Sequence, residues 1–116
     1  MISGIGTDII EIDRVQRAIE RWGDDFIKHV FCEEEIEYAK QNKNPFLHYA
    51  ARFAAKEAVF KAIGNQPALS WKDIKIVNDS YGRPVCSVKK LSPQKKVFVS
   101  LSHCKEYAVA NAIVTS

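Results

Sequence analysis

The spacing of apolar and polar residues divides the chain into a first strand, a helical part and a second set of strands. Residues 1–12 carry closely spaced isoleucines and two glycines, a pattern typical of a strand. The helical spacing that follows is opened by Asp13 as a cap residue and interrupted at Gly23. We expect three short helices in this part of the chain, over 14–22, 24–31 and 33–41.

A longer helix is predicted from Pro45 to Ile63. Asn44 precedes it as a cap residue, the proline suits the first helical position, and Gly64 ends it. One face of this helix carries Ala50, Phe53, Ala54, Glu57 and Lys61. Glu57 therefore interrupts an apolar stripe, and its carboxylate needs compensation because burying an unpaired charge is costly.

The last part of the chain has the pattern of strands, with a hairpin turn over 79–82. The four expected strands cover 71–78, 84–91, 96–102 and 107–114. A strand, then helices, then an antiparallel meander predicts one α+β domain over 1–116, with an antiparallel sheet packed against the long helix. The strand 107–114 is apolar on both faces, so we expect a neighbouring subunit to cover one of them.

Composition narrows the class of protein. The 116 residues are 47% hydrophobic and 27% charged, as in an ordinary soluble globular domain. The net charge of +3 favours an anionic partner without requiring one. Three cysteines without paired spacing argue against a disulfide framework or a zinc site. With no long apolar run and no signal-like start, we expect a cytoplasmic protein that does not enter the membrane.

Two distant segments carry candidate chemistry. Asp8 is a lone carboxylate in a β-prone run, and Glu57 lies on the long helix among Arg52, Lys56 and Lys61. Brought together, the two carboxylates would hold a hard divalent cation such as Mg²⁺, with the three cations around it. Phosphoryl-transfer sites use one or two carboxylates in this way, and phosphate and water complete the coordination. The pattern therefore indicates chemistry on a phosphate ester.

Each candidate also has a plainer interpretation. Glu57 and Lys61, four residues apart, are a common solvated pair on isolated helices. Asp8 can simply end a strand, and His103 can be a turn histidine without a metal. Gly4 and Gly6 indicate either a bulge or a close approach of another backbone. A cationic stripe on the first helix is often only solvated; its members are Arg14, Arg17 and Arg21.

Three separated segments resemble the signatures of the holo-acyl-carrier-protein synthases, the small bacterial 4′-phosphopantetheinyl transferases. Residues 4–11 are similar to the family's first motif, and residues 52–62 are similar to the second with every key position filled. Residues 100–103 followed by 107–110 resemble the closing strand-turn-strand. Shorter similarities at 69–74 and 82–84 lie between them, so the resemblance spans nearly the whole chain.

The resemblance implies a reaction and a set of site residues. Family members move the phosphopantetheine arm of coenzyme A onto a serine of apo acyl carrier protein, for fatty acid biosynthesis, and adenosine 3′,5′-bisphosphate leaves. Asp8 and Glu57 match the Mg²⁺ ligands, and Lys61 matches the lysine on the pyrophosphate. The base is either Glu57 itself or a metal-bound water that Asp8 or Glu57 orients. Residues expected around the coenzyme's phosphates, nucleotide and adenine are Arg52, Gly64, Gly82, Arg83, Pro84 and His103.

The resemblance also implies partners. The arginine stripe lies on the helix that family members use to dock the acidic recognition helix of the carrier protein. The family forms homotrimers with coenzyme A held between neighbouring subunits, so Arg52 is expected to serve a coenzyme bound mainly by the next subunit. Two loops depart from the family pattern: 64–67 and 89–96 are both shortened, which leaves their contacts with coenzyme and trimer open.

A rival interpretation is a small binding module that recognises an acidic protein or RNA through the arginine stripe. It explains the isoelectric point near 8.8 but not a glutamate on an apolar helix face beside Lys61. The chain also lacks the aromatic and basic strand signature of an RNA-recognition sheet, so we expect no nucleic-acid partner. Dependence on a divalent metal distinguishes the two interpretations.

Overall fold

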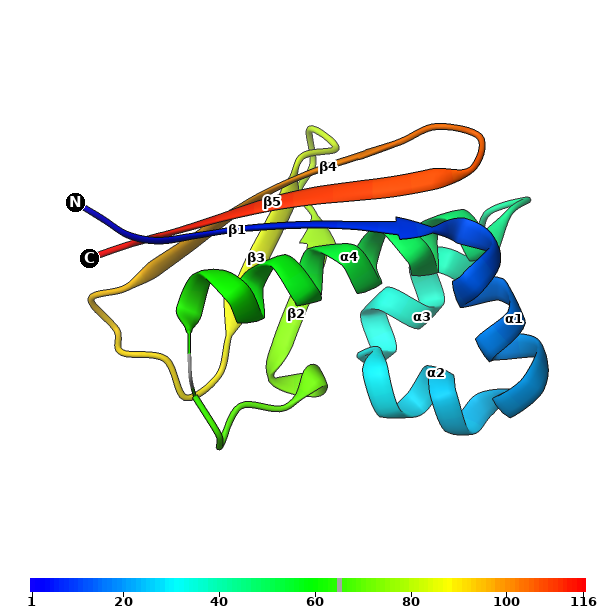
Figure 1. The fold of residues 1–116 in the computed structure, drawn as a ribbon, viewed down its shortest axis with the longest axis horizontal. Coiled ribbons are helices and arrows are strands. Elements are labelled where there is room, and N and C mark those ends of the chain that lie inside the picture. Colours follow the sequence, from blue (N-terminus) through cyan, green and yellow to red (C-terminus); the bar gives the residue numbers. More distant parts are fainter. Residues whose placement is uncertain (65) are drawn as a thin grey trace.

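The computed structural model describes residues 1–64 and 66–116, and Figure 1 shows their arrangement. In chain order the elements are β1 (Ile2–Glu11), α1 (Ile12–Trp22), α2 (Asp24–Val30), α3 (Glu33–Lys40), α4 (Pro45–Ile63), the 3₁₀ turn η1 (Trp71–Asp73), β2 (Ile74–Asn78), β3 (Pro84–Val88), β4 (Lys96–His103) and β5 (Tyr107–Thr115). The expected α+β class is confirmed, as are the four helices within one or two residues of their predicted ends.

The strands form two sheets rather than the single meander that the sequence suggested. β1, β5 and β4 make an antiparallel sheet with β5 in the centre, while β2 and β3 form a separate hairpin. Pairing of Ile2 with Thr115 brings the two ends of the chain together, as Figure 1 shows. The three-stranded sheet lies along the length of α4, with α1, α2 and α3 gathered at one end of that helix.

Small residues let α4 lie directly on the sheet. A Cβ atom at Gly4 would stand 1.8 Å from the carbonyl oxygen of Ala62, and one at Gly6 would stand 2.0 Å from that of Ala58. The facing residues of β5 are mostly alanines and are fully buried. The two glycines of β1 therefore mark a close backbone approach, one of the two interpretations that the sequence left open.

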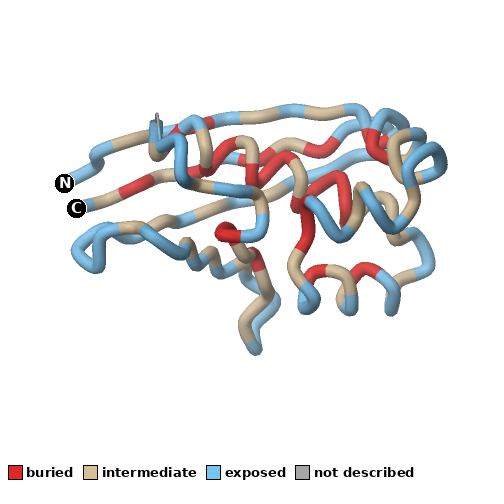
Figure 2. Tube along the Cα trace, turned by 90° about the horizontal axis from the view of Figure 1, so that it is seen from below, coloured by how far each residue is buried: buried red, intermediate tan, exposed pale blue. Residues whose placement is uncertain are grey.

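The other end of the core is built from large aromatic residues. Phe53 stacks on Trp71 with ring centroids 5.0 Å apart, and Phe31 lies 4.9 Å from Tyr49. These rings join α4 to α2 and to η1, whereas the alanines join it to the sheet. Figure 2 shows the buried segments running through the middle of the molecule, with exposed chain around them.

Three of the differences from the predicted element boundaries have a clear structural cause. Helix α1 begins at Ile12, whose N–H donates to the carbonyl of Glu106 (2.9 Å), so Asp13 lies in the first turn instead of capping it. Residues 71–73 form a 3₁₀ turn because the Asp73 carboxylate accepts from the backbone N–H of Ser70 (2.9 Å). β3 ends at Val88, before the backbone turns at Lys90 (φ 68°).

Among the described residues, no helix combines the length and the hydropathy needed to span a bilayer.

Candidate functional site

β1 and α4 bring Asp8, Glu57 and Lys61 to one place. Gly4, Gly6 and Asp8 alternate along β1 and so face α4 together, and the glycines admit the helix up to the point where Asp8 begins. Nζ of Lys61 lies 3.3 Å from Oδ1 of Asp8 and donates to the backbone carbonyl of Thr7 (2.9 Å). Glu57 stands one helical turn before Lys61 on α4.

The electrostatics of this cluster are unbalanced. The pKa of Glu57 is raised above its ordinary value, first by partial burial and then by the nearby Asp8 carboxylate, while Lys61 opposes the rise. Two carboxylates therefore lie close enough to repel each other beside one lysine, whose side chain is 54% exposed. A bound cation would relieve this repulsion.

The donor set suits a hard divalent cation. Carboxylate oxygens are ligands that Mg²⁺ prefers, and Mg²⁺ commonly takes one or two of them and completes its coordination with water and phosphate. Within the described residues no group of three or more His, Cys, Asp or Glu side chains is placed to hold a metal. Asp8 and Glu57 fit the sparse protein contribution that Mg²⁺ accepts together with a phosphate substrate.

Lys56 does not belong to this cluster, and the expectation that it surrounds the carboxylates is wrong. Its side chain is fully buried and lies 2.7 Å from Glu35 of α3. Adjacent residues on a helix point about 100° apart, so Lys56 faces α3 where Glu57 faces β1. Local sequence did not reveal this, because Glu35 is distant in the chain.

Arg52 was also expected beside the two carboxylates, and this is wrong too: it belongs to a second cluster on another face of α4. Its Nη2 donates to Oδ1 of Asn78 (3.1 Å), and its guanidinium lies 4.8 Å from the ring centre of Tyr38. The Nε atom is buried without a partner among the described residues. A cavity of about 380 Å³ adjoins these three side chains. A guanidinium that lines a cavity is suited to an anionic ligand.

Two histidines accompany Arg52. The pKa of His48 is lowered by burial, then by the positive charges of Arg52 and His103, so the three side chains lie near one another. His103 is exposed at the end of β4. The sequence analysis missed His48, Tyr38 and Asn78. His48 had one available signal: it precedes Arg52 by four residues and so shares its face of the helix.

Arg83 and Pro84 stand at the beginning of β3, beside a cavity of about 530 Å³ between β3 and β4. The turn before β3 is closed by Asp79, whose carboxylate accepts from the N–H groups of Tyr81 and Arg83 (both 2.9 Å). The Arg83 side chain is exposed and lies 3.4 Å from Asp79. These residues line a hollow large enough for part of a nucleotide.

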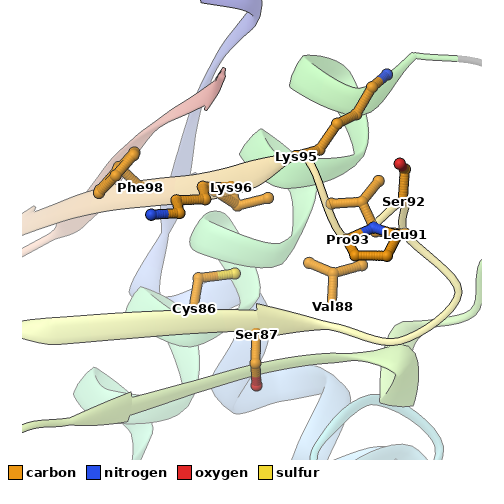
Figure 3. A pocket seen from close by; sticks show the side chains of 10 residues that line it. Cys86, Ser87, Val88, Leu91, Ser92, Pro93, Lys95, Lys96 and Phe98 are labelled. Carbon is orange, nitrogen blue, oxygen red and sulfur yellow. The ribbon is translucent and has the colours of Figure 1, made fainter. Parts of the chain in front are cut away.

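A second cavity, of about 330 Å³, continues this hollow toward the shortened loop at 89–96. Figure 3 shows Cys86 and Val88 pointing from β3 toward Phe98 and Lys96 of β4, while Ser87 points away. The other shortened loop follows Gly64, which caps α4 with φ 87°. Its neighbour Asn65 lies outside the described residues, so the structure describes only part of the loop at 64–67.

The predicted arginine stripe lies on α1, and all three of its arginines are exposed. Arg17 is paired with Asp13 (2.7 Å), a contact between two side chains that are each 67% exposed. Arg21 lies over the ring of Trp22, 4.9 Å from its centre, and Trp22 is itself 57% exposed. The stripe thus ends on an exposed aromatic residue that the sequence analysis did not single out.

The outer face of the three-stranded sheet is apolar and uncovered in the single chain. Ile5 is 69% exposed, Ile9 64% and Phe98 56%, and Ile5 and Phe98 flank Ile113 of β5. The inner face of β5 is covered by α4 instead. The two apolar faces predicted for this strand are confirmed, and one of them has no cover within the described residues.

Comparisons with known proteins agree over nearly the whole chain. A family model described as the 4′-phosphopantetheinyl transferase superfamily matches residues 4–112. The holo-[acyl-carrier-protein] synthase of Thermodesulfovibrio yellowstonii is 46% identical over 115 residues, with 99% of this chain and 100% of the relative covered. That of Protochlamydia amoebophila is 45% identical over 122 residues, with 100% of both chains covered.

Solved structures of the same group share the fold. A holo-(acyl-carrier-protein) synthase from Bacillus anthracis, in complex with coenzyme A (3′,5′-ADP), has a TM-score of 0.87 at 38% identity and covers 100% of this chain and 98% of its own. A Helicobacter pylori holo-[acyl-carrier-protein] synthase in complex with coenzyme A has a TM-score of 0.83 at 28% identity, with 96% and 99% covered.

Proposed function

The chain belongs to the 4′-phosphopantetheinyl transferase superfamily, in its holo-[acyl-carrier-protein] synthase group, and we propose that it transfers the 4′-phosphopantetheine moiety of coenzyme A to a serine of apo acyl carrier protein. The reaction releases adenosine 3′,5′-bisphosphate, requires Mg²⁺ and supplies carriers for fatty acid biosynthesis in the cytoplasm. Residues 1–116 act as one catalytic domain. Membership of an enzyme group decides against the rival binding module.

The observation that carries this proposal is the meeting of Asp8, Glu57 and Lys61. Two observations support it: Asp8 lies close enough to raise the pKa of Glu57, after burial as the larger cause, and the exposed ammonium of Lys61 lies 3.3 Å from Asp8. Sites that transfer phosphoryl groups need a place for a cation and a lysine beside it. Asp8 and Glu57 would hold Mg²⁺, which when bound neutralises charge on the phosphate oxygens.

The residues of this chain supply the remaining steps. The carrier serine provides the nucleophile, so its Oγ forms the new bond to phosphorus. Its proton passes to Glu57, directly or through an ordered water, since carboxylates serve as general bases in such sites. The electrons of the cleaved P–O bond leave with the adenosine 3′,5′-bisphosphate. Lys61 binds the pyrophosphate and stabilises the charge that develops there.

We assign the Arg52 cluster to the phosphates of the nucleotide end. The Arg52 guanidinium adjoins the cavity of about 380 Å³, and His48 and His103 lie near it. Arg83 and Pro84, beside the hollow between β3 and β4, are assigned to the adenine, with Gly64 close to the pyrophosphate. These are expectations of the family that the described geometry accommodates.

We propose a homotrimer in which each transfer site is shared by two subunits. Arg52 and Glu57 are five residues apart on α4 and so face different directions, which suits a coenzyme held between neighbours. The uncovered face around Ile5, Ile9 and Phe98 provides the apolar surface for such an assembly. Mixing inactive Asp8→Ala and Arg52→Ala proteins should then restore partial activity. A fully active monomer at micromolar concentration would contradict the assembly.

Docking of the carrier protein is assigned to Arg14, Arg17 and Arg21 on α1. An acidic recognition helix would find two of these arginines without an internal carboxylate partner among the described residues, since only Arg17 is paired, with Asp13. Charges of this kind at the edge of an interface speed the encounter of partners more than they deepen affinity.

The test of the proposed function is the mass of the carrier protein. Apo acyl carrier protein is incubated with coenzyme A, Mg²⁺ and this protein, and the carrier is weighed by intact mass spectrometry while adenosine 3′,5′-bisphosphate is measured by chromatography. We expect one phosphopantetheine group per carrier and an equal amount of released nucleotide. An unchanged carrier mass, with a serine-substituted carrier as control, would refute the assignment.

A further inference from the structure

A buried ion pair lies one residue away from the transfer site and is not used by the proposed chemistry. The side chains of Lys56 and Glu35 are both 0% exposed, and Nζ of Lys56 is 2.7 Å from Oε1 of Glu35. The same Nζ donates to the backbone carbonyls of Val30 (2.7 Å) and Trp71 (3.1 Å). All three N–H donors of the ammonium therefore have oxygen partners.

Glu35 is equally well occupied. Oε1 also accepts from the backbone N–H of Cys32, and Oε2 accepts from that of Ile76, both at 2.8 Å. Lys56 thus ties α4 to α3, to the end of α2 and to η1, and Glu35 adds β2 and the connection between α2 and α3. These separate parts of the chain meet at one buried ion pair.

The many hydrogen bonds of this pair are better explained by a role in positioning α4 than by a contribution to the stability of the fold. Desolvation of two buried charges consumes much of the free energy that their attraction returns, so apolar residues of similar size often stabilise as well. What an apolar pair cannot supply is a fixed direction for each hydrogen bond. Lys56 has three such bonds, from three directions, at one point on the helix.

The face of α4 toward the sheet has few such constraints, since the large rings of the helix at Tyr49, Phe53 and Phe60 pack against Phe31 and Trp71 instead. Its contact with β1 consists of glycine against the carbonyls of Ala58 and Ala62, and its contact with β5 is largely alanine. Small residues allow close approach but present few side chains that would resist rotation of the helix about its axis. Rotation by even a fraction of a turn would carry Glu57 and Lys61 away from Asp8.

We propose that Lys56 and Glu35 are positioning residues for transfer: their buried contact fixes the rotation of α4 and so holds Glu57 and Lys61 toward Asp8. This inference rests on the proposed function of that site. Neither residue touches the substrate or the metal. Removing the contact lowers metal affinity and turnover in protein that is still folded, and it leaves carrier docking on α1 unchanged.

The test uses Lys56→Met, the double variant Lys56→Met with Glu35→Gln, and Lys90→Met as a matched control. Lys90 is a half-exposed lysine that also pairs with a carboxylate, that of Asp73 in η1 (3.0 Å). Binding of Mn²⁺, as a probe for Mg²⁺, is measured by calorimetry with coenzyme A present, at 10 °C, where circular dichroism establishes that each variant is folded. Transfer kinetics are measured on the same samples.

We expect the Mn²⁺ dissociation constant to rise, and kcat to fall, by about ten- to a hundredfold in the Lys56 variants, the range seen when groups that orient metal ligands are removed. KM for the carrier protein should stay within about twofold, and Lys90→Met should match the wild type. Folded variants with wild-type Mn²⁺ affinity and kcat would overturn the proposal. So would failure of both variants to fold at 10 °C, since the pair would then be only structural. Wild-type protein that neither binds Mn²⁺ nor transfers would instead refute the proposed function itself.

Discussion

Helix α4 carries two lysines, each beside a carboxylate, and the two pairs have opposite properties. Lys56 and Glu35 are fully enclosed 2.7 Å apart, whereas Lys61 and Asp8 are 3.3 Å apart with the lysine 54% exposed. In the first pair every donor and acceptor is occupied by the protein. In the second, Lys61 is open to solvent and a further carboxylate, Glu57, adds negative charge. A closed pair determines geometry, and an open, unbalanced pair is available to a ligand.

The surroundings explain why one helix can hold both. Toward α2, α3 and η1, large rings such as Phe31 and Phe53 exclude water from Lys56. Toward β1, the glycines keep the strand close but leave Asp8 at an open edge of the contact. Low local dielectric makes charges costly unless paired, so the buried side demands full satisfaction and the open side does not.

The largest expected effect on transfer comes from changing Glu57 alone. Glu57→Gln keeps the shape of the side chain but removes its charge and basicity, so transfer should fall by at least about a thousandfold. Asp8→Ala should be similarly inactive, while urea unfolding midpoints remain close to the wild type because both residues lie at the open site. Turnover near the wild-type rate for Glu57→Gln at saturating Mg²⁺ would sink the assignment. Glu37→Gln, an exposed change on α3, is the control.

Changing the closed pair of Lys56 and Glu35 should mainly lower the free energy of unfolding. Glu35→Ala leaves the Lys56 ammonium buried without its counter-charge and also frees the N–H groups of Cys32 and Ile76. We expect a loss of about 3–5 kcal/mol in the free energy of unfolding, as for other broken buried pairs. The exposed neighbour Glu34→Ala should cost less than about 1 kcal/mol. Equal losses in urea titrations of the two variants would mean that burial does not distinguish the pairs.

The pH dependence of transfer tests the role of Glu57 at the open site. The pKa of Glu57 lies above its ordinary value near 4.5, chiefly because of partial burial and then because of Asp8. Transfer needs the ionised form, so kcat/KM should fall on acidification with a midpoint above 4.5. Saturating Mg²⁺ should move this midpoint downward, because a cation favours the carboxylate.

The same shift has a consequence for stability, with the opposite sign. A raised pKa in the folded state means that Glu57 favours folding most when protonated, below its unfolded value. That contribution is lost as pH rises through the raised folded pKa.

The predicted fall of kcat/KM on acidification is checked by rate profiles between pH 5 and 8 at two Mg²⁺ concentrations. If the midpoint of kcat/KM against pH did not change with Mg²⁺ concentration, a group other than Glu57 would be responsible for it.

The smallest expected effect concerns docking on α1. A variant with Arg14→Glu and Arg21→Glu should raise the apparent KM for carrier protein by about tenfold at low salt and flatten its salt dependence. Affinity for coenzyme A should change little, because both residues are assigned to the carrier protein and not to the coenzyme. Lys40→Glu on α3 provides a matched charge reversal. An unaltered carrier KM at low salt would show that the stripe is only solvated.

Much of the fold was predictable because its signals are local. Asn44, Pro45 and Gly64 mark both ends of α4, and the spacing of apolar residues gives the helices and most strands. The division into two sheets was not predictable, because it depends on β1 pairing with β5 from the opposite end of the chain. No local pattern records which strand that first segment will join.

The candidate site shows the same division. Asp8, Glu57 and Lys61 were proposed together from motifs, and the structure brings them together. Lys56 was placed wrongly because neighbours in sequence on a helix face different directions, and its true partner Glu35 lies on α3. His48 shares α4 with Arg52, but the presence of His103 in the Arg52 cluster depends on a tertiary contact between β4 and α4.

The most direct test of the central claim, that Asp8 and Glu57 hold a metal required for transfer, is the carrier mass measured with and without Mg²⁺. Protein treated with EDTA is incubated with coenzyme A and apo acyl carrier protein, and Mg²⁺ is then restored to half of the sample. We predict that the carrier gains a phosphopantetheine group only after Mg²⁺ is restored, and that Glu57→Gln protein leaves it unmodified in both halves. Equal modification in EDTA, or by Glu57→Gln protein, would contradict the account.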